Sequence, residues 1–514
     1  MSAGLKPWTT TAKSCGNVQD LRQAAASCQI HVMNPKRATL LAAAVVVAMA
    51  NVVQTPLAQT PHTTHPDAQW FPDAALGLFI HWDPAAVKGI NIGWSDIPGR
   101  RIAARKEPFP SAEVERIVRE DDYNLEGRPW PVTPNQYWAL ARDFKPDRYD
   151  PDKWLAAAKA AGFEYAVLTT KHHNGFALWP SRFGDFNTKN HMGGRDLLKD
   201  FVDACWRNKV KVGFYFSGPD WYFDREYYNF LYHGNEHPEF PALDPDLKPR
   251  KKTHTAVETA SHHKAYAELV KGQIEELLTN YGKIDVLWFD GKPSIPNASA
   301  VITADRIRAL QPGIVINPRL HGSGDYVTYE RNLTIAKKAT GWAEFCNTWT
   351  NNWSYVPQPF RANGFVLGEL AQSRALGVNH LLGVGPMATG ELEPDVYRNM
   401  SVVEAWMKRN GAAIKDAKPL ADTETASVPA TASGATRYLF VIPEFRDGSK
   451  YEKDLLPPVD ETLTLRGVPP HQSVTLLRDD SPLEASFAEG VVTIHLPASK
   501  RTQLVDVVRI QLTR

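Results

Sequence analysis

Short β-rich runs alternate with amphipathic helical patterns from Trp70 to about Asp416. A strand that is followed by a helix and then by another strand is typical of parallel β/α units. This alternation predicts an α/β fold, a (β/α)8-like TIM barrel with long loops. A doubly wound sheet is the alternative, but no Gly-x-Gly-x-x-Gly motif follows the first run. The runs are residues 77–82, 165–170, 211–217, 284–290, 314–318, 343–349 and 380–385.

The helical patterns have their own start, stop and spacing signals. Asp150 is a good N-cap, Pro151 suits the first helical position, and Gly162 ends the following turn. Apolar residues then recur at three- and four-residue intervals in 197–205 and in 266–281. We expect these segments to be helices that pack around the barrel.

The pattern changes after about Lys415 to short alternating polar and apolar runs that turn residues separate. Such runs predict a small antiparallel β-sandwich. We therefore expect a catalytic barrel domain over residues 67–416 and a sandwich domain over residues 417–514. The expected strands of the sandwich are 437–442, 461–467, 472–478, 490–496 and 505–512.

The first 66 residues contain a pattern typical of an export leader. A short basic region, 34–37, precedes the apolar run 38–50, and small residues at Ala50 and Ala58 offer cleavage sites. The apolar run is short for a membrane span, although a membrane anchor is the alternative. We expect an upstream extension that ends before Met33, then a signal peptide and a polar linker. The protein is then expected to be periplasmic or secreted.

The charge balance and the cysteines exclude several other classes of protein. The formal net charge is +1, and no basic stripe or nucleic-acid motif is visible. Only Cys205 and Cys346 lie beyond the leader, and no Cys/His spacing is typical of a metal site. We expect no disulfide framework, no cofactor, no nucleic-acid partner and no stable membrane insertion. The oligomeric state is left open.

In a barrel, catalytic side chains stand at the carboxyl ends of the strands. Trp288 and Asp290 share one face of the run VLWFD, and Asp290 is expected at the barrel mouth. A helix-capping role is the alternative for a strand-terminal Asp. By the same alternation His81 and Tyr215 point inward. Neutral donors, an aromatic wall and a carboxylate together suit a monosaccharide.

Two adjacent histidines, His172 and His173, follow another strand. They could bind a metal, bind a ligand through hydrogen bonds, or lie satisfied at the surface. Adjacent side chains point in different directions, so this pair is a poor metal site on its own. A metal-dependent hydrolase that uses His81, His172, His173 and Asp290 nevertheless stays an alternative.

Glycoside hydrolysis needs a second carboxylate as general acid and base. The residues that could supply it are Asp325 and Glu330, in the loop that we expect after residues 314–318, and Glu344 near the next strand. Spacing along the chain does not rank these three carboxylates.

Several motifs, in order, resemble the α-L-fucosidases of glycoside hydrolase family 29. The most specific are TTKHHNGF and LWFDG, and they occur at barrel spacing. The others are WFPDAALGLFIHW, KVGFYFS, INPR, GDYVTYE, WAEFCNTWTNNWSYVP and VNHLLGVGPMATGELEP, and the whole match runs from about Trp70 to Asp416.

The resemblance implies a retaining glycosidase that releases terminal α-L-fucose from fucosylated oligosaccharides or glycoconjugates. Asp290 would be the nucleophile, and Glu330, at the family's Thr-Pro-Glu position, would be the acid/base. The residues that would hold fucose are His81, Trp94, His172, His173, Tyr215, Trp288 and Arg319.

The chain also departs from the family pattern. Asn174, Asp83 and Gly383 replace the usual Asp, Gly and Asn, and Asn91 and Gly93 stand where a Glu often precedes the Trp. A glycosidase for another 6-deoxy or galacto-configured sugar, and a non-catalytic sugar-binding relative, are therefore alternatives.

We predict that the mature protein begins after Ala50 or Ala58, because a signal peptidase cleaves after small residues that follow an apolar run. N-terminal sequencing or mass analysis of native protein checks this. Recovery of the chain from the cell interior with Met1 intact would contradict it.

Overall fold

The computed structural model describes residues 62–95, 97–98, 132–231, 242–335 and 337–513. The expected upstream extension and leader lie outside this part of the chain. Residues 59–514 belong to one compact unit. Among the described residues, no helix has both the length and the apolar character needed to cross a membrane.

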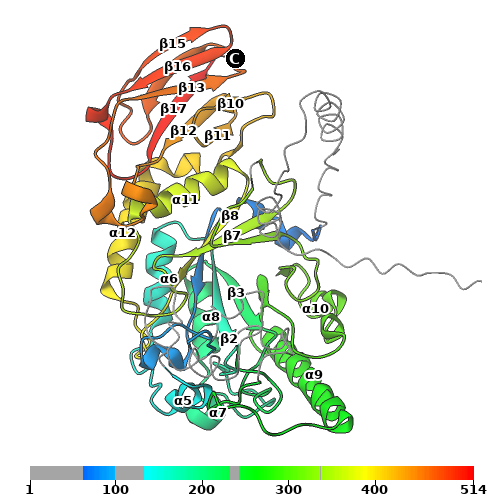
Figure 1. Ribbon diagram of the computed structural model, residues 1–514. Helices are drawn as coiled ribbons and strands as arrows, with labels where there is room; N and C mark the ends of the chain where they lie inside the picture. The colour runs from blue at the N-terminus through cyan, green and yellow to red at the C-terminus, as the bar shows by residue number, and fades with distance from the viewer. Residues whose placement is uncertain (1–61, 96, 99–131, 232–241, 336, 514) are drawn as a thin grey trace, which may run out of the picture. The chain divides into compact units, whose positions relative to one another are not determined.

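Eight parallel strands form a curled sheet in the order β5-β4-β3-β2-β1-β8-β7-β6 (Figure 1). This confirms the predicted barrel-type fold. The strands β5 and β6 form the two ends of the sheet, however, and do not pair with each other. The strands are β1 (Leu76–Ile80), β2 (Tyr165–Lys171), β3 (Lys211–Ser217), β4 (Val286–Asp290), β5 (Val315–Ile316), β6 (Val327–Glu330), β7 (Ala343–Thr348) and β8 (Asn379–Val384).

Residues 327–330 were expected in a loop, and this was wrong because they form strand β6. The strand VTYE is short, largely polar and largely solvent-accessible, so no apolar run marks it. Its backbone pairs in parallel with β7, with Glu330 opposite Cys346. The pairing thus places Glu330 at the carboxyl end of a barrel strand.

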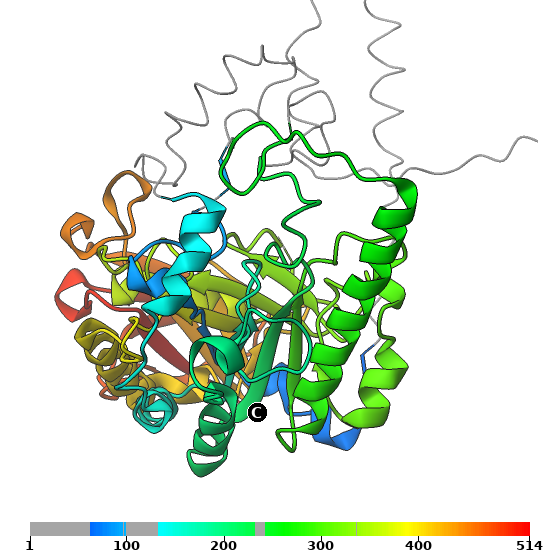
Figure 2. The same ribbon diagram turned by 90° about the horizontal axis from the view of Figure 1, so that it is seen from below.

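Helices α8 and α9 lie outside the curled sheet (Figure 2, teal and green). The predicted start at Asp150 is confirmed, because its side chain accepts a hydrogen bond from Lys153 N and caps α6. Helix α9 begins earlier than predicted, since Thr255 and Glu258 form a capping box. The helices are α5 (Pro134–Ala139), α6 (Pro151–Ala160), α7 (Thr188–His191), α8 (Leu197–Arg207), α9 (Ala256–Thr279), α10 (Ala304–Leu310), α11 (Asn363–Ala375) and α12 (Pro394–Asn410).

Two antiparallel sheets follow, with orders β10-β13-β16-β15 and β14-β17-β12-β11-β9. Apolar residues of both sheets share one core, so the predicted sandwich is confirmed. The strands not predicted are short or mostly exposed: β9, β10, β11 and β15. The bounds are β9 (Lys418–Pro419), β10 (Thr425–Ala426), β11 (Ala430–Ser433), β12 (Thr436–Val441), β13 (Glu461–Arg466), β14 (His471–Leu476), β15 (Glu484–Ala488), β16 (Val491–Leu496) and β17 (Asp506–Leu512).

A buried arginine of α11 connects distant parts of the chain. Arg374 is 1% exposed and donates to the carbonyl oxygens of Pro72 and Ile414, both at 3.2 Å. Its Nη1 also lies 3.2 Å from Asn379 Oδ1 on β8. The guanidinium therefore joins the segment before β1, the barrel sheet and the segment that leads into the sandwich.

The segment after β2 is held by one buried carboxylate of α9. Glu276 is 3% exposed. It accepts hydrogen bonds from Trp179 Nε1 (3.0 Å), Ser181 Oγ (2.7 Å) and the backbone N of Arg182 (3.0 Å). This segment begins just after His172 and His173, so Glu276 helps to fix the rim of the barrel.

We predict that Glu276→Ala lowers the free energy of unfolding by about 3 kcal/mol, because three buried donors lose their acceptor. Urea unfolding followed by tryptophan fluorescence measures the change. Glu275→Ala is the matched control, since its carboxylate forms only a surface pair with Arg306 and should cost less than about 1 kcal/mol. Equal losses in the two variants would contradict the assigned role.

Candidate active site

A pocket with a cavity volume of about 140 Å³ lies at the carboxyl ends of the barrel strands. It collects side chains at or just beyond the ends of β1 to β6, with one more from β7. All nine residues that the sequence analysis proposed for the site line it together. The lining residues are Phe79, His81, Trp94, His172, His173, Tyr215, Trp288, Asp290, Arg319, Glu330, Cys346 and Trp353.

The last residue of β4, Asp290, has partners on both carboxylate oxygens. Tyr215 donates its hydroxyl to Oδ2 at 2.7 Å, and Arg319 Nη1 donates to Oδ1 at 2.7 Å. Burial alone would raise the pKa of Asp290. The charge of Arg319, together with His173 and the hydrogen bonds from Tyr215 and Arg319, lowers the pKa below its usual value. Asp290 is therefore an ionised carboxylate at neutral pH.

Arg319 also reaches the second carboxylate of the pocket. Its Nη2 lies 2.5 Å from Glu330 Oε2, so one guanidinium binds Asp290 and Glu330 at the same time. The two carboxylates are therefore separated by no more than one guanidinium group and the two hydrogen bonds that it donates. The side chain of Glu330 is 37% exposed, whereas that of Asp290 is 21% exposed. Glu330 thus lies on the solvent side of the pair.

The other two candidate carboxylates do not line the pocket. Glu344 is fully buried below it and accepts hydrogen bonds from Tyr165 (2.6 Å) and Trp288 Nε1 (2.8 Å). Burial raises the pKa of Glu344 to about 7. Asp325 is also buried and accepts from the backbone N of Ile316 at 2.7 Å. These hydrogen bonds account for the burial of both carboxylates and indicate a structural role.

The three histidines of the pocket are neutral. Burial lowers the pKa of His81 to about 3 and lowers the pKa values of His172 and His173. Because Ser217 donates its hydroxyl to Pro219 O, we assign the proton between His173 and Ser217 to His173 Nδ1. His173 Nε2 lies 3.4 Å from Asp290 Oδ2.

Two buried nitrogens of the pocket lack a hydrogen-bond partner, namely His81 Nδ1 and His172 Nδ1. Both atoms are closed off from solvent, and His172 Nδ1 faces the turn at Gly93. Aromatic rings form the walls, since Tyr215 stacks on Trp288 at 5.6 Å and His81 stacks on Trp353 at 5.0 Å. Polar groups between aromatic faces suit a sugar ring.

Three residues that line the pocket were not predicted from the sequence. Phe79 and Cys346 lie on strands, and alternation along β1 and β7 could have placed them inside the barrel. Trp353 lies in the loop after β7, where no periodic signal exists. Cys346 is a free, buried thiol, and burial raises its pKa well above the usual value.

A tight turn brings the first barrel loop against the histidine pair. Gly93 has a φ of +73°, a conformation that favours glycine. A Cβ added there would lie 2.4 Å from His172 Cε1. Trp94, the next residue, packs edge-on against His173 at 5.5 Å. The Glu that the family resemblance leads one to expect before Trp94 therefore does not fit this backbone.

In the part of the chain that the structure describes, one residue group has the spacing of a metal site. The ligand atoms of His172, His173 and Asp290 all lie within 4.8 Å of one another. However, the Arg319 cation lies against Asp290, with Nη1 2.7 Å from Oδ1. A divalent ion at this position would be repelled by the guanidinium.

Comparisons with known proteins agree with this picture. The sequence profile of the family described as Alpha-L-fucosidase matches residues 42–412. The tissue alpha-L-fucosidase of Mus musculus is 27% identical over 376 residues, which cover 69% of this chain and 73% of the relative. The tissue alpha-L-fucosidase of Homo sapiens is 26% identical over 410 residues, covering 75% and 78% of the two chains.

Solved structures share the fold. Alpha-L-fucosidase isoenzyme 1 from Paenibacillus thiaminolyticus has a TM-score of 0.61 at 26% identity, covering 87% of this chain and 99% of that chain. An alpha-L-fucosidase from Bacteroides thetaiotaomicron has a TM-score of 0.64 at 22% identity, covering 89% and 98% of the two chains.

We predict that the pocket works without a metal, because the guanidinium of Arg319 already provides its positive charge. Prolonged treatment with EDTA should leave turnover unchanged, and mass spectrometry should find transition metals only at substoichiometric levels in the purified protein. Loss of turnover that zinc or manganese restores would contradict this.

Proposed function

The chain belongs to the alpha-L-fucosidase family of glycoside hydrolases, and we propose that it hydrolyses terminal α-L-fucosyl residues with retention of configuration. Asp290 is the nucleophile in this proposal, and Glu330 is the acid/base. The observation that carries it is the pair of carboxylates that Arg319 holds at the mouth of the barrel. The substrate is a fucosylated oligosaccharide or glycoconjugate.

In the first step, a carboxylate oxygen of Asp290 attacks the anomeric carbon of the sugar. The bond from this carbon to the glycosidic oxygen breaks, and Glu330 donates a proton to that oxygen. In the second step, Glu330 takes a proton from water, the water oxygen attacks the anomeric carbon, and Asp290 leaves. Two inversions retain the configuration.

Asp290 and Glu330 share Arg319 but differ in exposure and in their other partners. Arg319 donates to both of them while the pocket contains no sugar. Glu330 is the more exposed of the two carboxylates. In this proposal the leaving group displaces the contact between Arg319 and Glu330, which leaves Glu330 available as the acid/base. Asp290 keeps its bond from Tyr215 and stays ionised.

The neutral histidines bind the sugar hydroxyls. His81, His172 and His173 line the pocket and offer ring nitrogens to these hydroxyls. Trp288 forms the wall beside the apolar face of the sugar. Since Gly93 replaces the expected Glu, one contact to the sugar is missing, and a related sugar is the second candidate substrate. Turnover of aryl glycosides of L-fucose, D-galactose and L-rhamnose, compared side by side, distinguishes these substrates.

We predict that Asp290→Gly folds and binds fucose but loses turnover by at least about 10⁴-fold, because the glycosyl-enzyme no longer forms. Hydrolysis of an aryl α-L-fucoside measures the loss. Proton NMR of the wild type should show the α-anomer of fucose first, and a 2-fluoro sugar should label the peptide with Asp290.

Asp285→Asn is the matched control for this experiment. Asp285 is a buried carboxylate just before β4 that accepts from Val212 N at 3.0 Å, an interaction that Asn keeps. This variant should retain most of the activity. Near-normal turnover in Asp290→Gly, or release of the β-anomer first, would disprove the proposed nucleophile.

We predict that Glu330→Gln slows substrates with poor leaving groups far more than activated aryl fucosides, which need no proton. Azide should restore turnover of the activated substrate, because the covalent intermediate still forms and then lacks a base. Steady-state kinetics with and without azide measure both effects. If Glu344→Gln showed this pattern and Glu330→Gln did not, the assignment of the acid/base would be wrong.

A further inference from the structure

A second pocket, with a cavity volume of about 750 Å³, lies between β7, α11 and the segment 442–450 of the C-terminal part. None of its lining residues belongs to the pocket that contains Asp290. The lining residues are Arg331, Asn332, Leu333, Phe345, Asn347, Asn351, Arg361, Phe365, Gly368, Glu369, Gln372, Ile442, Pro443, Phe445, Gly448, Ser449 and Lys450.

The pocket exists because the barrel wall lacks a helix here. In the described part of the chain, the segments that connect β5 to β6 and β6 to β7 contain none. Along β7, Cys346 points into the first pocket, whereas its neighbours Phe345 and Asn347 point outward into the second. One strand thus separates two cavities that have different linings.

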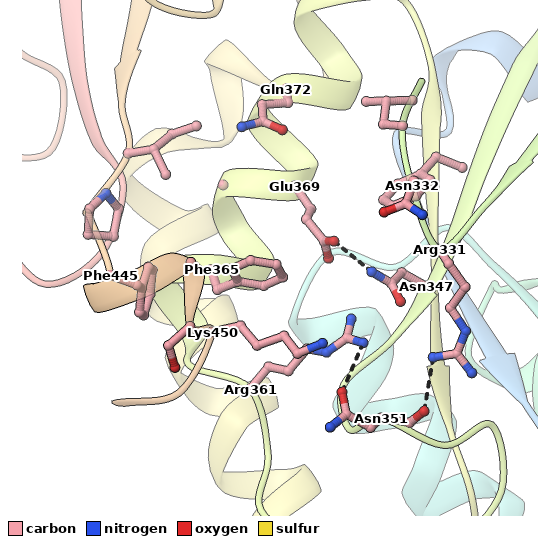
Figure 3. A pocket seen from close by; sticks show the side chains of 17 residues that line it. Arg331, Asn332, Asn347, Asn351, Arg361, Phe365, Glu369, Gln372, Phe445 and Lys450 are labelled. Carbon is pink, nitrogen blue, oxygen red and sulfur yellow. Dashed lines mark hydrogen bonds between the residues drawn. The ribbon is translucent and has the colours of Figure 1, made fainter. Parts of the chain in front are cut away.

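Positive charge dominates this second pocket. Arg331, Arg361 and Lys450 contribute cations, and Glu369 is the single acidic residue among the lining side chains. From the side of α11, Glu369 reaches toward Asn347 and Arg361 toward Asn351 (Figure 3). The guanidinium of Arg331 donates to Thr348 Oγ1 and Asn351 O and lies over the Trp353 ring at 4.3 Å. Such a lining favours an anionic ligand.

Arg361 is the strongest sign that a ligand is missing. The residue is 4% exposed, and its guanidinium makes a long contact of 3.4 Å from Nη2 to Asn351 Oδ1. The Nε and Nη1 atoms have no hydrogen-bond partner. A buried guanidinium without a salt bridge is costly, and an anion bound beside it would lower that cost.

Glu369 does not supply that counter-ion. Its Oε1 accepts from Asn347 Nδ2 at 2.6 Å, and its Oε2 has no hydrogen-bond partner. Burial raises the pKa of Glu369 to about 7, even though the charge of Arg361 acts in the opposite direction. Its carboxyl group is therefore partly protonated near neutral pH and neutralises the cations only in part.

We propose that this pocket binds an anionic sugar, a monosaccharide unit that carries a carboxylate or a sulfate group. The anionic group lies against Arg361 and Lys450, the ring packs on Phe365, and the amide of Asn332 binds hydroxyl groups. Aromatic faces beside amides and cations suit such a unit, and the volume is within the usual range for ligand pockets. The proposal does not depend on the function proposed for the first pocket.

Isothermal titration of the whole protein with four probes tests this. The probes are D-glucuronic acid, D-galactose 6-sulfate, D-galactose and sodium sulfate. We expect the two acidic sugars to bind at least about tenfold more tightly than galactose, because a charged hydrogen bond is lost in the neutral sugar. The acidic sugar that binds more tightly shows whether the pocket prefers a carboxylate or a sulfate group. Sodium sulfate should bind more weakly than either, since it has no ring.

Three variants then locate the ligand. Lys450→Met and Arg361→Gln should weaken binding of the acidic sugar about tenfold. Glu369→Gln should tighten it, because a negative charge disappears. Lys453→Met is the control for Lys450, since this exposed lysine of the same segment does not line the pocket. If Arg361→Gln does not fold, Lys450→Met and Glu369→Gln still decide the matter.

Three outcomes would overturn the proposal. The first is that neither acidic sugar binds the wild type. The second is that galactose or sulfate alone binds as tightly as the acidic sugars. The third is that Lys450→Met and Lys453→Met have equal effects, or that Glu369→Gln weakens binding.

Discussion

The site depends on one guanidinium group that stands where the barrel sheet is open. The backbones of β5 and β6 do not pair, yet Arg319, just after β5, binds Asp290 at the end of β4 and Glu330 at the end of β6. Two carboxylates this close would repel each other in a low-dielectric pocket without a shared cation. A side chain therefore joins the two ends of the sheet that backbone hydrogen bonds leave apart.

The surrounding groups follow from this arrangement. Tyr215 donates to the oxygen of Asp290 that Arg319 does not bind, so both oxygens are occupied. The histidines are buried and uncharged, which leaves the net charge of the pocket to the two carboxylates and the arginine. Trp288 lies under Arg319 at 4.5 Å and is itself fixed by Glu344. Glu344, the alternative candidate for the acid/base, thus supports the pocket wall by accepting the hydrogen bond from Trp288.

The sequence predicted those strands and site residues that a periodic apolar pattern indicates. Strand alternation placed His81, Tyr215 and Asp290 on inward faces, and the structure brings them together. Arg319 was reached only through the family resemblance, and only that resemblance ranked Glu330 above Asp325 and Glu344, because the short polar strand β6 leaves no apolar pattern. Trp353 was missed, since a loop residue reaches the pocket through tertiary packing alone. Glu330 and Glu344 differ in burial, a property that spacing along the chain does not carry.

The turn at Gly93 limits how this chain can change its sugar. A side chain at this position would need a different backbone conformation and a displaced His172 at the same moment. A single amino-acid replacement supplies neither, so any intermediate sequence would combine a strained turn with a disturbed histidine pair. An acidic side chain at position 93 would therefore be reached only through intermediate sequences of lower stability or activity. Adaptation to a new sugar would proceed more readily through Trp353 and its loop, where the backbone imposes no such requirement.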